Sequence, residues 1–332
     1  MKPLFHPRLV NGPTGDPVLY IELLFDRRAL LFDLGDVHAL TPRQILKIGH
    51  VFVSHTHMDH FVGFDTLLRL FLGRDKVLHL YGPPGFLDRV EHRLGGYTWN
   101  LVANYASDFV VSAVEAHPDG TRLAADFHTR SAFRREPSQA PSLPRDVLLE
   151  DESLLVRFAF LDHQIPCLAF ALEEKLHVNV WKTGLDELGL PTGPWLRGLK
   201  AAVARGEPDD TPVSFNGRTL PLGQLRDKVL RLVPGQKIAY VTDAAYHEAN
   251  IRAITALARG VDMLFIEAAF AGEDAERAAA KHHLTARQAG RLAREAGARR
   301  LIPFHYSPKY TGREESLLQE ALDAFEGRAG SV

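Results

Sequence analysis

A short polar loop directly after a buried strand constrains this chain more than any other feature. Residues 51–60 read VFVSHTHMDH, so four potential metal ligands occupy six consecutive positions. His55 and His57 can point the same way if extended geometry persists, while Asp59 and His60 lie at the turn into the next helix. A hydrogen-bonded polar loop is the alternative. We favour a metal pair, because crowding imidazoles at a strand end brings no stability of its own.

Thiolate chemistry is excluded by composition. The chain has 16 histidines but a single cysteine, Cys167, which we expect to be a small core residue. Disulfide frameworks, four-cysteine zinc sites and iron–sulfur clusters are therefore ruled out within one chain. The first residues lack the apolar stretch of a secretory signal, and no run approaches the roughly 18 apolar residues of a membrane span. We expect a cytoplasmic protein without a membrane partner.

The charge balance is close to neutral. There are 39 basic and 41 acidic residues, for a net charge of -2. This gives no global electrostatic case for nucleic-acid binding, although it leaves room for a local basic patch. The length of 332 residues suits two ordinary domains or one large layered domain.

Apolar runs and helical periodicity predict the order of the elements. Two sets of strands, each accompanied by helices, predict an α/β four-layer αββα sandwich of two mixed sheets. We expect an exposed loop over 134–145 and an irregular excursion at about 177–235. The predicted strands span 18–25, 29–32, 51–53, 77–81, 109–116, 123–128, 154–161, 167–172, 237–241, 263–266 and 301–304. The predicted helices span 64–72, 86–94, 248–258, 286–296 and 314–325.

Two clustered ions need more ligands than one loop holds, so strand ends are the next place to search. His163, Asp243 and His305 each follow an apolar run, which is where layered folds collect functional side chains. Asp162 competes with His163 for this role. Asp243 could instead cap the helix that follows.

A further pair, His282 and His283, precedes the predicted helix 286–296. A histidine at this position could donate a proton to a departing alkoxide or stabilise developing phosphate charge. The residues alone do not distinguish the two.

These motifs together resemble those of metallo-β-lactamase-fold hydrolases, and within them the ribonuclease Z branch. Ile165-Pro166 after His163 and the His-x-Thr context of His283 favour ribonuclease Z over glyoxalase II and the β-lactamases. The motifs that carry the resemblance are, in order, 33–35 (DLG), 55–60, Gly63, 161–166 (LDHQIP), Asp243, 283–285 (HLT) and 305–307 (HYS).

The resemblance implies a ligand set for two zinc ions per chain, although manganese and iron also suit such ligands. Asp243 would bridge the two ions. His283 would assist the leaving oxygen, and Asp59 could also orient or deprotonate the nucleophile. The implied ligands are His55, His57 and His163 for one ion, and Asp59, His60 and His305 for the other.

The implied function is that of a dinuclear zinc phosphodiesterase, an endonuclease acting at the 3′ ends of precursor tRNA. The resemblance also implies one metallo-β-lactamase-fold domain over residues 1–332 and a homodimer. Two alternatives stay open. A same-fold metallohydrolase could act on a small phosphodiester, lactone or thioester, because residues 36–38 and 11–30 depart from the family pattern near its substrate. A protein of another class, a catalytically silent binding protein, could have kept the fold.

Overall fold

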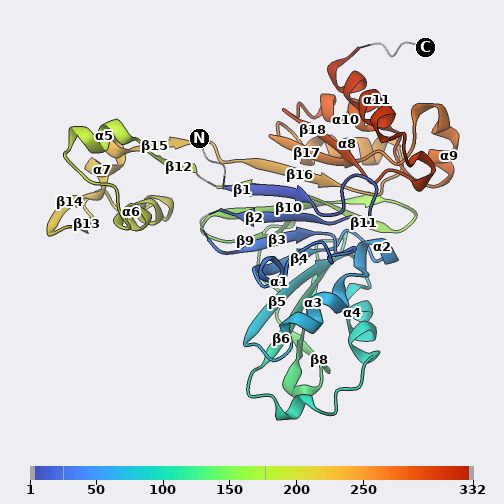
Figure 1. The fold of residues 1–332 in the computed structure, drawn as a ribbon, viewed down its shortest axis with the longest axis horizontal. Helices are drawn as coiled ribbons and strands as arrows, with labels where there is room; N and C mark the ends of the chain where they lie inside the picture. The colour runs from blue at the N-terminus through green and yellow to red at the C-terminus, as the bar shows by residue number, and fades with distance from the viewer. Residues whose placement is uncertain (1–3, 25, 176, 329–332) are drawn as a thin grey trace.

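Two mixed β-sheets face each other at the centre of the computed structural model, which describes residues 4–24, 26–175 and 177–328 (Figure 1). The first sheet has eight strands in chain order, parallel from β3 to β6 and antiparallel on both sides. Its strands are β1 (Phe5–Leu9), β2 (Leu19–Leu23), β3 (Ala29–Phe32), β4 (Ile48–Phe52), β5 (Lys76–Gly82), β6 (Phe109–Ala116), β7 (Arg122–His128) and β8 (Arg135–Ser138).

The second sheet has six strands in the order β18-β17-β16-β11-β10-β9. The three strands β16 to β18 run parallel, and the other neighbours are antiparallel. Parallel strands bring their carboxyl ends to one edge, where functional side chains can meet. The strands are β9 (Val147–Glu150), β10 (Leu154–Asp162), β11 (Pro166–Glu174), β16 (Lys237–Val241), β17 (Met263–Glu267) and β18 (Leu301–Phe304).

Aromatic side chains fill the space between the sheets. Phe32 of the first sheet stacks on Phe170 of the second, with ring centroids 5.3 Å apart, and Tyr240 lies 5.7 Å from Phe32. All three side chains are fully buried, so they anchor one sheet to the other by hydrophobic burial and ring contact.

Helices cover the outer face of each sheet and complete the four layers (Figure 1). The predicted αββα sandwich is confirmed. In α3, Phe64, Leu67, Leu68 and Phe71 are buried at helical spacing, so one stripe packs on the sheet. No helix in the described part of the chain is both long and apolar enough to cross a membrane. The helices are α1 (Pro42–Ile45), α2 (Met58–Phe61), α3 (Phe64–Phe71) and α4 (Phe86–Gly95) on the first sheet, then α8 (Glu248–Leu257), α9 (Ala275–Ala280), α10 (Ala286–Glu295) and α11 (Glu314–Glu326) with the second.

Within the two main sheets the sequence missed three strands, and all three lie at sheet edges. β1 and β8 end the first sheet, and β9 ends the second. β1 contains Pro7 and β8 contains Pro137. Edge strands tolerate proline because one side needs no ladder hydrogen bond, yet proline hides the strand pattern in the sequence. The expected exposed loop over 134–145 was therefore wrong over 135–138, where β8 lies.

Residues 177–233 form an arm that projects from the sandwich, at the left of Figure 1. The expected excursion from the core lies here, but it is not irregular, because the arm has short regular elements and its own hydrophobic cluster, which includes Leu199, Leu225 and Val229. Its helices have six to ten residues, too few for a clear apolar period. The elements are β12 (His177–Val180), α5 (Lys182–Glu187), α6 (Trp195–Ala204), β13 (Pro212–Phe215), β14 (Arg218–Pro221), α7 (Leu222–Val229) and β15 (Leu230–Val233).

Candidate metal centre

The seven predicted ligands come from both sheets and meet at one edge of the sandwich. His55 follows β4, and the short helix α2 then carries Asp59 and His60. The second sheet supplies the others from positions just after its strands. His163 follows β10, Asp243 follows β16 and His305 follows β18. This arrangement explains why residues up to 250 positions apart in the chain become neighbours.

Two glycines let the ligand loop approach the turn after β3. A Cβ atom on Gly63 would lie 2.1 Å from the Gly35 carbonyl oxygen, and one on Gly35 would lie 2.4 Å from the carbonyl oxygen of Asp59. Backbone bonds hold the contact: Leu34 N–H donates to His60 O and Gly63 N–H donates to Leu34 O, both at 2.9 Å. The contact between the turn after β3 and the ligand loop therefore fixes the direction of α2.

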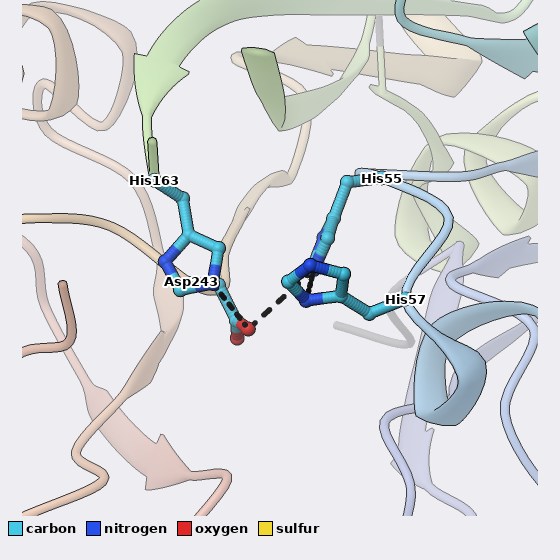
Figure 2. A group of neighbouring side chains, drawn as sticks. All are labelled: His55, His57, His163 and Asp243. Carbon is cyan, nitrogen blue, oxygen red and sulfur yellow. Dashed lines mark hydrogen bonds and ion pairs between the residues drawn. The ribbon is translucent and has the colours of Figure 1, made fainter. Parts of the chain in front are cut away.

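Figure 2 shows the first cluster, in which three imidazoles converge on Asp243. The possible ligand atoms of His55, His57, His163 and Asp243 lie within 4.8 Å of one another. His55 Nε2 is 3.6 Å and His163 Nε2 is 3.5 Å from Asp243 Oδ2. His55 Nε2 is also 2.9 Å from His57 Nδ1. Three nitrogens and one carboxylate oxygen match the donor set of a catalytic zinc site.

The second cluster adjoins the first and consists of Asp59, His60 and His305. Both His60 Nε2 and His305 Nε2 lie 3.3 Å from Asp59 Oδ2. Asp243 reaches this cluster as well, because its Oδ1 is 2.9 Å from His305 Nδ1 and its Oδ2 is 3.6 Å from His60 Nε2. Asp243 therefore lies between the two clusters.

Two of the imidazoles are oriented by partners behind the site. His60 Nδ1 lies 2.9 Å from Asp33 Oδ2, and His163 Nδ1 lies 2.8 Å from the His282 carbonyl oxygen. Donation from Nδ1–H leaves Nε2 as the basic atom, which is the usual arrangement of metal-binding histidines. His60 Nε2 is buried and has no hydrogen-bond partner among the described residues. An unpartnered nitrogen facing two carboxylates fits a bound cation.

Asp33 is a buried carboxylate whose role the sequence did not reveal. Besides His60, its oxygens accept hydrogen bonds from Ser54 N–H at 2.7 Å, Ser54 Oγ–H at 2.9 Å and Tyr240 O–H at 2.8 Å. Asp33 has a φ of +58°, a conformation that aspartate tolerates better than most residues. The carboxylate thus joins β3, the ligand loop and the second sheet.

Burial and mutual charge set the protonation of the clustered groups. Burial, together with the nearby charge of His60, lowers the pKa of His55 to about 2, so this imidazole is neutral and able to bind metal. Burial alone would lower the pKa of His60, but Asp243 and Asp33 raise it. For Asp243 burial acts to raise the pKa, while the charges of His305 and His60 hold it well below the usual carboxyl range. Asp243 is therefore ionised.

His283 lies beside the clusters and is held by a second missed carboxylate, Glu267. Its Nδ1 is 2.8 Å from Glu267 Oε2. Glu267 is fully buried and also accepts from Ala244 N–H at 2.7 Å and Leu284 N–H at 3.2 Å. Burial would lower the pKa of His283, but the Glu267 charge raises it. The sequence signal that could have identified Glu267 is its position directly after the predicted strand 263–266, like that of Asp243 after the strand 237–241.

The sequence left two choices open, between His282 and His283 and between Asp162 and His163, and the structure distinguishes the members of each pair. His283, and not His282, contacts Glu267, while His282 offers its carbonyl oxygen to His163. Asp162 belongs to neither cluster, and its Oδ2 lies 3.2 Å from His247 Nε2. A cavity of about 530 Å³ opens over the site. Its lining includes His57, Asp59, His163, Asp243, His283 and His305.

Comparison with known proteins decides the family. The chain is 34% identical to ribonuclease Z of Deinococcus radiodurans over 307 residues, which cover 91% of this chain and 90% of that protein. The chain belongs to the ribonuclease Z family. Ribonuclease Z of Brevibacillus brevis is 30% identical over 89% of this chain and 82% of its own length. The model of the beta-lactamase superfamily domain matches residues 218–306.

Solved structures place this ribonuclease Z family member in the metallo-β-lactamase fold. Human tRNase Z, short form, superposes with a TM-score of 0.53 at 18% identity, covering 92% of this chain and 93% of that protein. The metallo-beta-lactamase fold protein YhfI of Bacillus subtilis gives a TM-score of 0.54 at 16% identity, covering 96% of this chain and 92% of that protein. The fold is thus shared even where few residues are identical.

Proposed function

We propose that this chain is a metal-dependent endoribonuclease that removes 3′ trailers from precursor tRNA. The observation that carries the proposal is the pair of ligand clusters joined by Asp243 in a chain whose relatives are named ribonuclease Z. The name of the human structural neighbour, tRNase Z, supports the substrate class.

We further propose that the centre holds two zinc ions, one on each cluster. His55, His57 and His163 would hold the first, and Asp243 would bridge to the second. Asp59, His60 and His305 complete the set, through atoms within 4.8 Å of one another. When bound, a metal pair lowers the pKa of water and neutralises charge on a phosphodiester during in-line displacement. Manganese or iron would suit the same ligands.

The residues of the chain supply positioning and proton transfer. Asp59 lines the cavity and can orient the attacking water. His283 also lines it, and Glu267 raises the pKa of its imidazole and occupies its Nδ1. Nε2–H of His283 can then protonate the 3′ oxygen as its bond to phosphorus breaks. The tRNA keeps a 3′-hydroxyl, and the trailer leaves with the phosphate.

The proposal is tested by offering zinc-loaded protein two substrates. Precursor tRNA and bis(p-nitrophenyl) phosphate share the phosphodiester but differ in everything the protein could recognise around it. We expect cleavage of precursor tRNA at the 3′ end of the mature sequence. Hydrolysis of the small ester alone, at every metal and salt condition, would instead support the small-substrate alternative. Hydrolysis of neither would support the silent binding protein.

The homodimer implied by the family resemblance stays a prediction. Light scattering coupled to size-exclusion chromatography checks it directly. A mass near twice the 37.0 kDa of one chain is expected, and a mass equal to one chain would contradict it.

A further inference from the structure

A groove between α10 and α11 lies next to the metal centre but is not part of it. The groove encloses about 1130 Å³. Phe270 lines the metal-centre cavity while the next residue, Ala271, lines the groove. Helix α10 begins at Ala286, three residues after His283. The groove and the metal-centre cavity are therefore lined by consecutive residues of one segment.

Arginines dominate the wall that α10 contributes. Arg287, Arg291 and Arg294 are exposed and follow one another at i, i+4 and i+7, so they share one face of the helix. Two further arginines, Arg313 and Arg328, line the groove as well. The carboxylates in the lining are Glu273, Glu295, Glu320 and Asp323.

Three of the five arginines have carboxylate partners in the structure. Arg287 Nε lies 3.1 Å from Glu320 Oε1, and that carboxylate also accepts from Gly272 N–H. Arg328 Nε is 3.4 Å from Asp323 Oδ1. The guanidinium of Arg313 lies 3.9 Å from Glu273. These pairs occupy three of the four carboxylates in the lining.

Arg291 and Arg294 differ from the other three. Within the described residues, neither guanidinium group has a hydrogen bond or an ion pair. Arg294 lies against Gly327, where a Cβ atom would be 2.1 Å from its Nη1. Gly327 ends α11 with a φ of +74°, so a glycine both closes the helix and leaves room for the guanidinium. Like charges on one helix face disfavour the helix, so helix stability does not explain the pair.

We propose that this arginine groove binds the phosphate backbone of the RNA that is cleaved at the neighbouring metal centre. The inference rests on the proposed RNA substrate and adds a second contact site to it. Guanidinium groups bind phosphate through paired charge-assisted hydrogen bonds. Arg291 and Arg294 have all their donors available for such bonds. Glu295 is the one lining carboxylate without an ion pair in the described structure. Its negative charge opposes the binding of phosphate in the groove.

The test replaces both free arginines, in the variant Arg291→Gln/Arg294→Gln. RNA binding is followed by fluorescence anisotropy as salt is raised, because each lost phosphate contact should reduce the slope of log K against log salt by about 0.7–0.9. We expect KM for RNA to rise about two- to fivefold per arginine. Hydrolysis of bis(p-nitrophenyl) phosphate should stay unchanged, since neither arginine lines the metal-centre cavity.

Two further variants control this experiment. Arg252→Gln removes an exposed arginine on α8, outside the groove and paired with Glu248 at 2.9 Å, and should leave RNA binding unchanged. Glu295→Gln removes the opposing charge, so RNA binding should tighten.

The outcomes separate the groove from the proposed function. RNA cleavage by the wild type with an unchanged KM and salt slope in the folded double variant would overturn the groove alone. RNA binding that depends on the two arginines, without cleavage by the metal-loaded wild type, would overturn the proposed function and leave the groove. Absence of RNA binding by the wild type would overturn both.

Discussion

The variant Asp33→Asn tests whether the carboxylate behind the metal centre prepares His60 for metal binding. In the wild type, Asp33 Oδ2 accepts from the His60 ring at 2.9 Å and from the Tyr240 hydroxyl at 2.8 Å. Oδ1 accepts from Ser54 N–H at 2.7 Å. A carboxamide has the same shape, but one end becomes a donor. That end must face either the Ser54 N–H or the His60 Nδ1–H.

The lower-cost response is for His60 to switch its proton from Nδ1 to Nε2. The nitrogen that faces Asp59 and Asp243 would then carry a hydrogen and could not bind a cation. Losing such an orienting partner typically lowers metal affinity 10–100-fold, which corresponds to about 1.4–2.7 kcal/mol. Only the second cluster should be affected, because in the described structure the Asp33 carboxylate makes no hydrogen bond to His55, His57 or His163.

Metal affinity is measured by competition with a chromophoric chelator, and circular dichroism checks the fold. Tyr240→Phe is the matched control, since it removes another donor to the same oxygen without touching His60. It should cost about 1 kcal/mol of unfolding free energy, the net value of one hydrogen bond, and keep both metal affinities. Equal metal affinities in Asp33→Asn and the wild type would refute the reasoning.

Three other substitutions test separate parts of the site. His283→Ala should lower RNA turnover and keep the metal content, whereas Asp243→Ala should lose metal; elemental analysis showing the same metal content in both would overturn their division of roles. Glu267→Gln removes the charge that raises the pKa of His283, so the acid form is lost at lower pH, and the alkaline limb of the kcat profile should move to lower pH; an unmoved limb would argue against His283 as the acid. Gly63→Ala should cost about 1–3 kcal/mol of stability, because its Cβ would lie 2.1 Å from Gly35 O, while Gly49→Ala, with no atom within 4 Å, should melt close to the wild type.

The sequence predicted the central strands and the large helices of the sandwich well, because these elements have clear apolar periods. It missed β1 and β8, whose prolines break the strand pattern, and β9, which is an edge strand of four residues. It also left the arm as irregular, since elements of four to ten residues show too little of either period.

The sequence could predict the metal ligands, because they lie next to strand ends. It could not predict the carboxylates that orient the site histidines, because those contacts join residues far apart in the chain. All seven predicted ligands lie together in the structure. The roles of Asp33 and Glu267 depend on contacts that sequence spacing does not show, such as that between Asp33 and Tyr240, 207 residues apart. The choice between His282 and His283 likewise required the position of Glu267.

The most direct test of a dinuclear RNA-cleaving centre is a zinc titration of metal-free protein, followed by the initial rate of precursor-tRNA cleavage. The ligand clusters around Asp243 predict that the rate rises to a plateau at two zinc ions per chain, with a 3′-hydroxyl on the tRNA product. A plateau at one ion per chain, or full activity without metal, would contradict the dinuclear assignment. No cleavage of precursor tRNA at any loading would contradict the proposed function itself.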